Sequence, residues 1–169
     1  MVLKNTFGWE LKLKMKTELK YSIFLSVFTL VYLTIEFYCG FQTKFIGYHT
    51  IVTYVIIIPY IVIAMQGMTE KKREFGGKLS NRRAFRSGMT IGIITAILSP
   101  IVVVIFIKFI NPNFFADSID YAVSTKKSTQ SQAENYFNLK NYLFRSAIGS
   151  LINGLIISIV ASIFLVKKE

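Results

Sequence analysis

The sequence predicts an all-α fold: an integral membrane four-helix bundle with a short helical extracytoplasmic loop between its third and fourth spans. The first observation is composition, because 53% of the 169 residues are hydrophobic, far more than a soluble domain of this size requires. The second is residues 87–107, which run without one charge between Arg86 and Lys108. A helix of about 20 residues crosses a hydrocarbon core of roughly 30 Å, so this stretch is typical of a membrane span.

Three further apolar stretches complete the set, and we interpret residues 1–169 as one membrane domain. The predicted spans are residues 21–41, 50–68, 87–110 and 142–166. Residues 1–20 are expected to form a helix at the membrane surface that runs into the first span. No small-x-small cleavage site follows that span, so we expect an uncleaved anchor. The short loop of residues 42–49 permits only an antiparallel return into the second span.

Basic residues gather on one side of the predicted membrane. Residues 1–20, residues 69–86 and the Lys167–Lys168 tail hold 14 of the 20 lysines and arginines. Cytoplasmic loops of membrane proteins carry an excess of these residues, so we expect both termini in the cytoplasm. The basic charge then has anionic lipid headgroups as its nearest acidic partner, and we expect no nucleic-acid partner.

The segment of residues 111–141 is expected to form the outer helical loop. Asn111-Pro112 predicts the end of the third span and the start of a helix over residues 113–123, since Asn suits the N-cap and Pro the first helical position. A second helix is predicted to start with a capping box, either Thr129 with Gln132 or Ser131 with Glu134. We expect that helix to continue into the fourth span.

Small residues recur at four-residue intervals in the third and fourth spans. They are Gly88, Gly92 and Ala96 in the third span and Ser146, Ser150, Gly154 and Ser158 in the fourth. Small side chains let helix backbones approach closely inside a membrane and gain dispersion contacts. We therefore predict that these two spans form the central pair. A homodimer built through the fourth span is the alternative, and the spacing alone does not choose between the two.

Three charged residues lie near the outer ends of their spans at similar depth, namely Glu36, Lys108 and Arg145. Charges inside a membrane are costly and usually paired, so the sequence predicts a charged layer in which Glu36 pairs with Lys108 or Arg145. A solute or proton site at Glu36 is the alternative interpretation.

Two prolines, Pro59 and Pro100, lie near the middle of the second and third spans, and Asn153 lies near the middle of the fourth. Each proline frees a backbone carbonyl one turn earlier in its helix. Membrane helices tolerate proline for packing reasons, but broken helices also form the solute sites of transporters. Asn153 is expected to make a hydrogen bond between helices, with a polar path as the alternative.

The residue inventory argues against catalysis and metal binding. The chain has one cysteine, Cys39, and one histidine, His49, so no cluster has the spacing of metal ligands. No nucleophile–histidine–acid set, paired acids at mid-span, phosphate-binding glycine loop or cofactor motif occurs. We therefore expect a protein that is not an enzyme, with no catalytic residues and no cofactor.

Several short stretches are similar to a known family. They are Phe85-Arg-Ser-Gly, Leu98-Ser-Pro, Phe109-Ile-Asn-Pro-Asn-Phe-Phe and Ala133-Glu-Asn-Tyr-Phe-Asn-Leu-Lys. With them the chain resembles an uncharacterised family of small bacterial four-span membrane proteins, a domain of unknown function. The resemblance implies the same architecture in the bacterial inner membrane. It implies no activity, so no functional residues follow from it.

Two functions of different classes are compatible with these features. We expect a non-enzymatic scaffold or accessory subunit, with a membrane-protein partner or a second copy of the chain, because no charge lies at mid-span and small-residue faces are abundant. A transporter or channel subunit for a small solute or ion is the alternative. A continuous polar cavity that reaches the middle of the bundle would favour the alternative.

Overall fold

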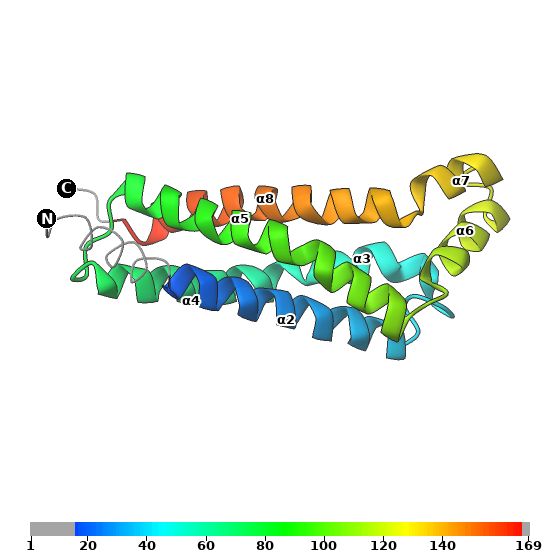
Figure 1. Ribbon diagram of the computed structural model, residues 1–169, viewed down its shortest axis with the longest axis horizontal. Helices are drawn as coiled ribbons and strands as arrows, with labels where there is room; N and C mark the ends of the chain where they lie inside the picture. Colours follow the sequence, from blue (N-terminus) through cyan, green and yellow to red (C-terminus); the bar gives the residue numbers. More distant parts are fainter. Residues whose placement is uncertain (1–15, 167–169) are drawn as a thin grey trace, which may run out of the picture.

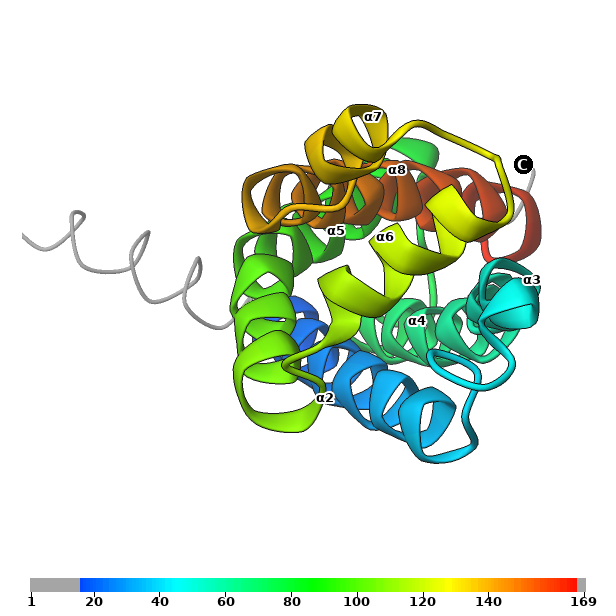
Figure 2. The ribbon, with the colours of Figure 1, turned by 90° about the vertical axis from the view of Figure 1, so that its right-hand side faces the viewer.

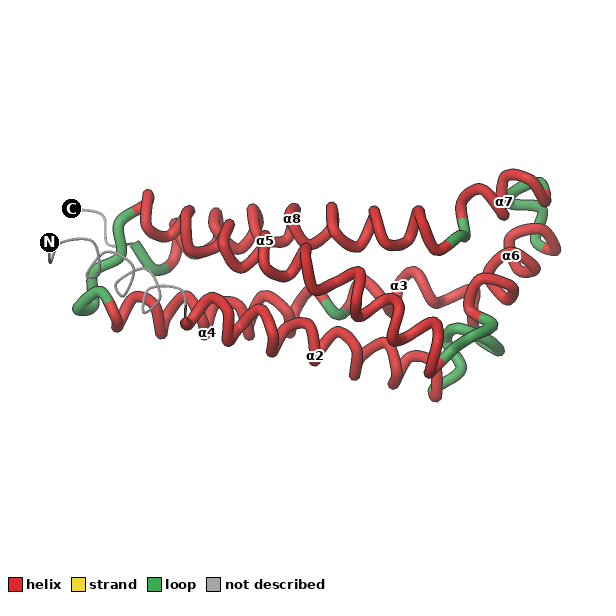
Figure 3. Tube along the Cα trace, viewed as in Figure 1, coloured by secondary structure: helices red, strands yellow, loops and turns green. Residues whose placement is uncertain are grey.

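A computed structural model describes residues 16–166, which consist of helices and connecting turns with no strand (Figure 3). The predicted all-α fold is confirmed. Four helical segments in this range are long and apolar enough to cross a membrane: Lys16–Tyr38, Ile46–Glu74, Asn81–Ile110 and Leu139–Phe164. The helix predicted within residues 1–15 and the Lys167–Lys168 tail lie outside the described residues.

The elements follow one another as an antiparallel bundle with a helical cover at one end (Figures 1 and 2). They are α2 (Lys16–Tyr38), the 3-10 helix η1 (Ile46–Tyr48), α3 (His49–Val55), α4 (Ile57–Glu74), α5 (Asn81–Ile105), the π-helical segment η2 (Phe106–Ile110), α6 (Phe114–Ser124), α7 (Gln130–Tyr136) and α8 (Leu139–Phe164). We call the end with residues 75–80 the basic end and the opposite end the α6–α7 end.

The helices reach further toward the basic end than the apolar stretches predict. α4 and α5 continue through most of the predicted loop of residues 69–86 and leave only residues 75–80 as a connection. Gly76 and Gly77 make this turn with φ angles of 69° and 81°, which favour glycine. Ser80 caps α5 by accepting a backbone N–H at 3.4 Å. The charged residues of this segment are good helix formers, which explains the longer helices.

The outward faces of the long helices are apolar. Val31, Ile97 and Ile163 are each at least half exposed, and many other large apolar side chains are exposed with them. A soluble bundle places charged and polar residues on such faces. Exposed apolar faces on four helices of this length therefore suggest a membrane protein.

α5 and α8 touch through their backbones. A Cβ on Gly92 would lie 2.6 Å from the Gly154 Cα, and a Cβ on Gly88 would lie 2.8 Å from the Ser158 Cα. The Ser158 hydroxyl donates to the Phe85 carbonyl at 3.1 Å and so adds a hydrogen bond between the two helices. The predicted small-residue faces therefore meet.

The contact loosens toward the α6–α7 end. Ala96 lies one turn beyond Gly92 on α5, Ser146 lies two turns beyond Gly154 on α8, and both are only half-buried. Figure 1 shows α5 beside α8 near the basic end and beside α2 at the α6–α7 end.

An apolar core fills the half of the bundle near the basic end. Its buried members are Leu25, Tyr60, Ala64, Met68, Leu79, Ala84, Ile91, Ile157 and Ala161. They come from α2, α4, α5, α8 and the residue 75–80 turn, so this half is packed by all four long segments.

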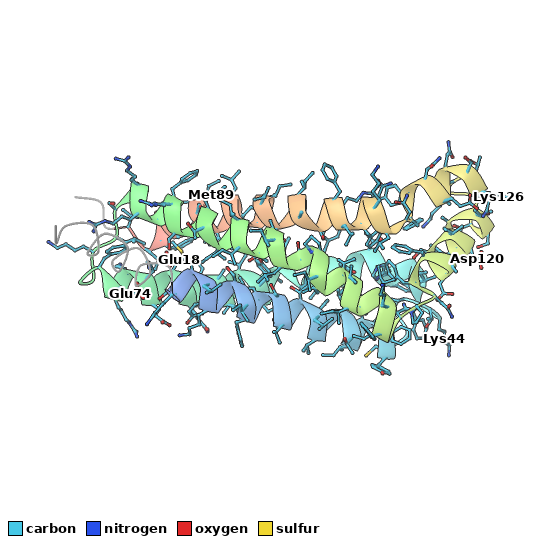
Figure 4. The ribbon with its side chains drawn as sticks, in the orientation of Figure 1. Glu18, Lys44, Glu74, Met89, Asp120 and Lys126 are labelled. Atoms are coloured by element: carbon cyan, nitrogen blue, oxygen red, sulfur yellow. The ribbon has the colours of Figure 1, made fainter. Side chains whose placement is uncertain are left out.

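A buried ionic network joins α2, α4 and α5 beside this core. The Lys71 Nζ lies 2.9 Å from a Glu18 carboxylate oxygen, and the Ser87 hydroxyl donates to the other Glu18 oxygen at 2.5 Å. Lys71 also contacts Glu74 at 2.9 Å. Glu18 and Lys71 are only 5% and 2% exposed, and Figure 4 labels Glu18 and Glu74 near the basic end. The acid–base pairing between helices is thus found at the end opposite to the one predicted.

The two prolines have different effects. Pro59 lies in the first turn of α4, where the missing N–H costs nothing, and the second span breaks at Ile56 between α3 and α4. Pro100 lies inside α5, which continues past it. The Ser99 hydroxyl donates at 3.5 Å to the Ala96 carbonyl, the group that Pro100 leaves without a backbone donor.

The connection between η2 and α8 holds two short helices, and their boundaries differ partly from the prediction. Asn113, not Asn111, directly precedes α6. Thr129 and Gln132 form the capping box of α7, the first of the two predicted starts. α7 does not continue into α8, because Asn138 adopts an extended conformation and caps α8 by accepting a backbone N–H at 3.0 Å.

The first prediction concerns the α5–α8 contact. Gly154→Ile is expected to lower the thermal unfolding temperature in detergent, because overpacking costs about 1–3 kcal/mol and here the new side chain meets backbone. Gly149→Ile on the same helix is the matched control, since a Cβ there would meet nothing within 4 Å. Equal unfolding temperatures for the two variants would contradict the contact.

The second prediction concerns the ionic network. Glu18→Gln removes a charge that faces buried Lys71, and loss of one partner of a buried pair costs about 3–5 kcal/mol. We expect a value near the low end, because Glu74 still contacts Lys71. Glu70→Gln, which affects an exposed pair with Lys20, is the control and should change the unfolding temperature much less. A loss for Glu18→Gln no larger than that control would show that the network does not stabilise the bundle.

Candidate functional site

A cavity of about 830 Å³ occupies the half of the bundle near the α6–α7 end. Ser26, Tyr60, Thr95 and Asn153 line its inner limit, and each lies near the middle of its helical segment. From there the cavity extends to the turn between α6 and α7. Gly149 on α8 faces open space, in contrast to the crowded Gly154 five residues further on. One half of the bundle is therefore packed and the other is hollow.

The cavity lining mixes apolar side chains with hydroxyl groups. Leu33, Val102 and several isoleucines supply the apolar part. The hydroxyl groups belong to Ser26, Thr29, Thr50, Thr53, Tyr54, Tyr60, Thr95, Ser99, Ser118, Tyr121, Ser128, Tyr136, Tyr142, Ser146 and Ser150.

The inner hydroxyl groups are already bonded to their own helices. Those of Ser26, Thr29, Thr95 and Ser150 donate to the carbonyl four residues earlier at 2.8 to 2.9 Å. A hydroxyl that donates in this way keeps its oxygen as an acceptor. The inner part of the cavity therefore offers acceptor oxygens to a bound molecule. The hydroxyl of Tyr60, at the same inner limit, is buried and has no hydrogen-bond partner within the described residues.

An aromatic cluster holds α6 across the end of the bundle. The Phe114 ring contacts His49 of α3, Phe106 of η2 and Tyr142 of α8, with ring centroids 5.9, 6.1 and 5.2 Å apart. All three contacts are edge-to-face, the geometry that aromatic pairs prefer. Figure 2 shows α6 crossing the end of the bundle that faces the viewer. Phe114 thus fixes the cover over the cavity to three different segments.

Glu36 is buried behind the cavity wall and is only 2% exposed. One carboxylate oxygen accepts from the Gln42 amide at 3.3 Å and from the Thr53 hydroxyl at 3.2 Å, and it lies 3.6 Å from the His49 Nδ1. The other oxygen has no hydrogen-bond partner within the described residues. The Gln42 oxygen in turn accepts from the Asn111 amide at 3.1 Å. This cluster links α2, α3 and the end of η2.

The predicted charged layer does not form in the described structure, where Glu36 has no ion pair with Lys108 or Arg145. Lys108 is exposed and lies in η2, whose π-helical turn changes the direction of its side chain relative to a continuous α-helix. The Arg145 guanidinium lies 3.6 Å from the centre of the Tyr136 ring and lines the cavity. The turn after α2 instead brings Gln42, Thr53 and His49 to Glu36.

Most residues of the cavity wall were not predicted from the sequence. Serine and threonine recur three or four residues apart in α2, as Ser22, Ser26 and Thr29, and in α5, as Thr95 and Ser99. The same spacing of Ser146 and Ser150 in α8 suggested only packing against the third span, yet both line the cavity. Hydroxyl stripes in three spans were the available signal. Within residues 16–166 no group of three or more His, Cys, Asp or Glu residues is placed to hold a metal ion.

The third prediction concerns Glu36. Glu36→Gln is expected to change the free energy of unfolding by no more than about 1 kcal/mol, because glutamine retains the oxygen that accepts from Gln42 and Thr53. Glu18→Gln, measured beside it by thermal unfolding in detergent, should be clearly more destabilising. An equal loss for both would mean that the negative charge of Glu36 itself stabilises the fold, with His49 as the nearest group that can carry a positive charge.

Comparison with known proteins gives the family but no activity. No curated protein and no solved structure matches this chain. One family model matches residues 20–167, a range that includes nearly all of α2 and every later helix. The chain therefore belongs to the family described as "Protein of unknown function (DUF4199)".

Proposed function

We propose that the chain is a multi-pass membrane protein that binds a small solute in the cavity, as a transporter or as the solute-binding subunit of one. The observation that carries the proposal is the cavity of about 830 Å³, which reaches from the α6–α7 end to the middle of the bundle. Sites for small molecules typically enclose about 300–1,000 Å³ and combine apolar walls with a few polar groups. Mid-membrane binding is usual in transporters.

The broken second span supports this role. The break at Ile56 lies on the cavity wall, which Tyr54, Ile56 and Ile57 line. The irregularity is local, because Ile56 keeps a helical conformation and its carbonyl accepts from the Tyr60 N–H at 3.0 Å. Irregular backbone within a span is tolerated where it lines a cavity, as it does in transporter sites.

The packed half provides the barrier that a carrier needs on its other side. The cavity ends near the middle of the described helices, and the apolar core fills the bundle from there toward the basic end. The Glu18–Lys71 pair closes the same half near the basic end. Transport would require α2, α4 and α5 to separate at this end while the cavity closes at the other.

We propose that the basic end faces the cytoplasm of a bacterial inner membrane. The excess of lysine and arginine near this end supports the orientation, with anionic headgroups as neighbours. The cavity then opens away from the cytoplasm. The scaffold or accessory role, with no enzymatic step, is the competing outcome, and a stoichiometric partner that co-purifies in mild detergent would favour it.

The fourth prediction tests access to the cavity. In a Cys39→Ser background, Asn153→Cys should react with the small neutral reagent N-ethylmaleimide in the folded protein, because Asn153 lines the cavity. Ile157→Cys, one turn further along α8, is the control and should stay unreactive, since Ile157 is fully buried in the core. Protection of both positions until the protein is unfolded would contradict a solute cavity and favour the scaffold.

The fifth prediction tests orientation in intact cells. In the same Cys39→Ser background, a membrane-impermeant thiol reagent should label Ser124→Cys, at the end of α6, without lysis. Gly76→Cys, in the turn at the basic end, should be labelled only after lysis. Labelling of Gly76→Cys before Ser124→Cys would reverse the proposed topology.

A further inference from the structure

We propose that the ligand of the cavity is a small organic anion whose charged group binds at Arg145. The inference rests on the proposed function, because it requires that the cavity binds a solute. The charged side chains on the cavity wall are of one sign. Arg145 and Lys127 line the cavity, and no aspartate or glutamate does so among the described residues.

Arg145 is arranged like an anion receptor. Its guanidinium stacks on the Tyr136 ring at 3.6 Å, which fixes the plane of the group. Within residues 16–166, no carboxylate lies within the 4 Å of an ion pair with it. A stacked guanidinium keeps its N–H groups at its edge, where they match the two oxygens of a carboxylate or the oxygens of a phosphate.

Lys127 adds a second positive charge where the cavity reaches the turn between α6 and α7. Its Nζ donates to the Tyr121 hydroxyl at 3.3 Å and lies 4.8 Å from the centre of that ring. Tyr121 and Lys127 both line the cavity. A cation at this position raises the local concentration of anions and favours their entry.

The acids of this half of the molecule do not oppose these cations on the wall. Glu36 lies behind the wall, where its carboxylate accepts hydrogen bonds from Gln42 and Thr53. At this place the cavity is lined by Thr53 and His49 and not by Glu36. Asp117 and Asp120 of α6 and Glu134 of α7 lie at the α6–α7 end, where Figure 4 labels Asp120, but none of them lines the cavity. The wall is therefore selective for negative charge. Its inner hydroxyl oxygens suit hydrogen-bond donors on the ligand, and its apolar side chains suit apolar parts of the ligand.

Three probes of nearly equal shape test the sign of the charge. Benzoate, benzyl alcohol and benzylammonium are compared as competitors of N-ethylmaleimide at Asn153→Cys, in the full chain in neutral detergent at constant ionic strength. We expect benzoate to slow labelling at a concentration at least about tenfold lower than benzyl alcohol, with benzylammonium the weakest. Arg145→Gln should abolish the advantage of benzoate over the alcohol, and Arg145→Lys should retain part of it.

Lys108→Gln is the matched control, because Lys108 is an exposed cation near the same end that does not line the cavity. It should leave the preference for benzoate unchanged. Protection by benzylammonium equal to that by benzoate would overturn the inference, and so would a benzoate preference that survives Arg145→Gln. Labelling that none of the probes slows would also overturn it, but would leave the proposed function standing. An unlabelled Asn153→Cys variant would overturn both.

An anionic group can reach Arg145 from solution or from a lipid headgroup. The labelling is therefore repeated in vesicles of phosphatidylcholine alone and with added phosphatidylglycerol. Slower labelling caused by phosphatidylglycerol itself, and lost in Arg145→Gln, would identify the lipid headgroup as the source. Slowing by benzoate that is equal in both kinds of vesicle would identify a soluble anion.

Discussion

The backbone contact between α5 and α8 is the constraint on which the rest of the structure depends. Gly92 and Gly154 approach so closely that no side chain fits between them, and the Ser158 hydroxyl bonds across the same interface. Burial of apolar surface gives little drive for association inside a membrane, so close packing of this kind must supply it. The contact is confined to the basic half, because α5 then turns from α8 toward α2 (Figure 1).

This divergence explains why one bundle has two unlike halves. Near the basic end, the apolar core and the Glu18–Lys71 network bind α2, α4 and α5 together. Toward the other end, the distance between α5 and α8 is bridged by α6, which Phe114 fixes to three segments. The cavity is thus a consequence of helix geometry. The hydroxyl-bearing wall supplies the polar atoms that such a space requires when it lies at membrane depth.

The sequence predicts the fold better than the site. Uncharged stretches and the four-residue repeat of small side chains are local patterns, and they correctly indicate four long helices and the α5–α8 contact. The partners of Glu36 depend on the turn after α2, which brings Gln42 to it, and on the π-helical segment η2, which sets the direction of the Lys108 side chain. No local sequence pattern predicts either feature. Glu18 and Lys71 lay outside the predicted spans, so no pairing between them was expected. The hydroxyl stripes were visible, but only the divergence of the helices distinguishes a cavity wall from a packed face.

A profile of water access along α8 tests the central claim most directly, because this helix passes from the hollow half into the packed half. Nitroxide labels at Gly149 and Asn153 face the cavity, whereas labels at Ile148 and Ile152 lie on exposed apolar positions. In lipid vesicles, we expect a water-soluble nickel relaxant to reach the first two positions and oxygen dissolved in lipid to reach the other two. Equal, lipid-like access at all four positions would contradict a solute cavity within the bundle.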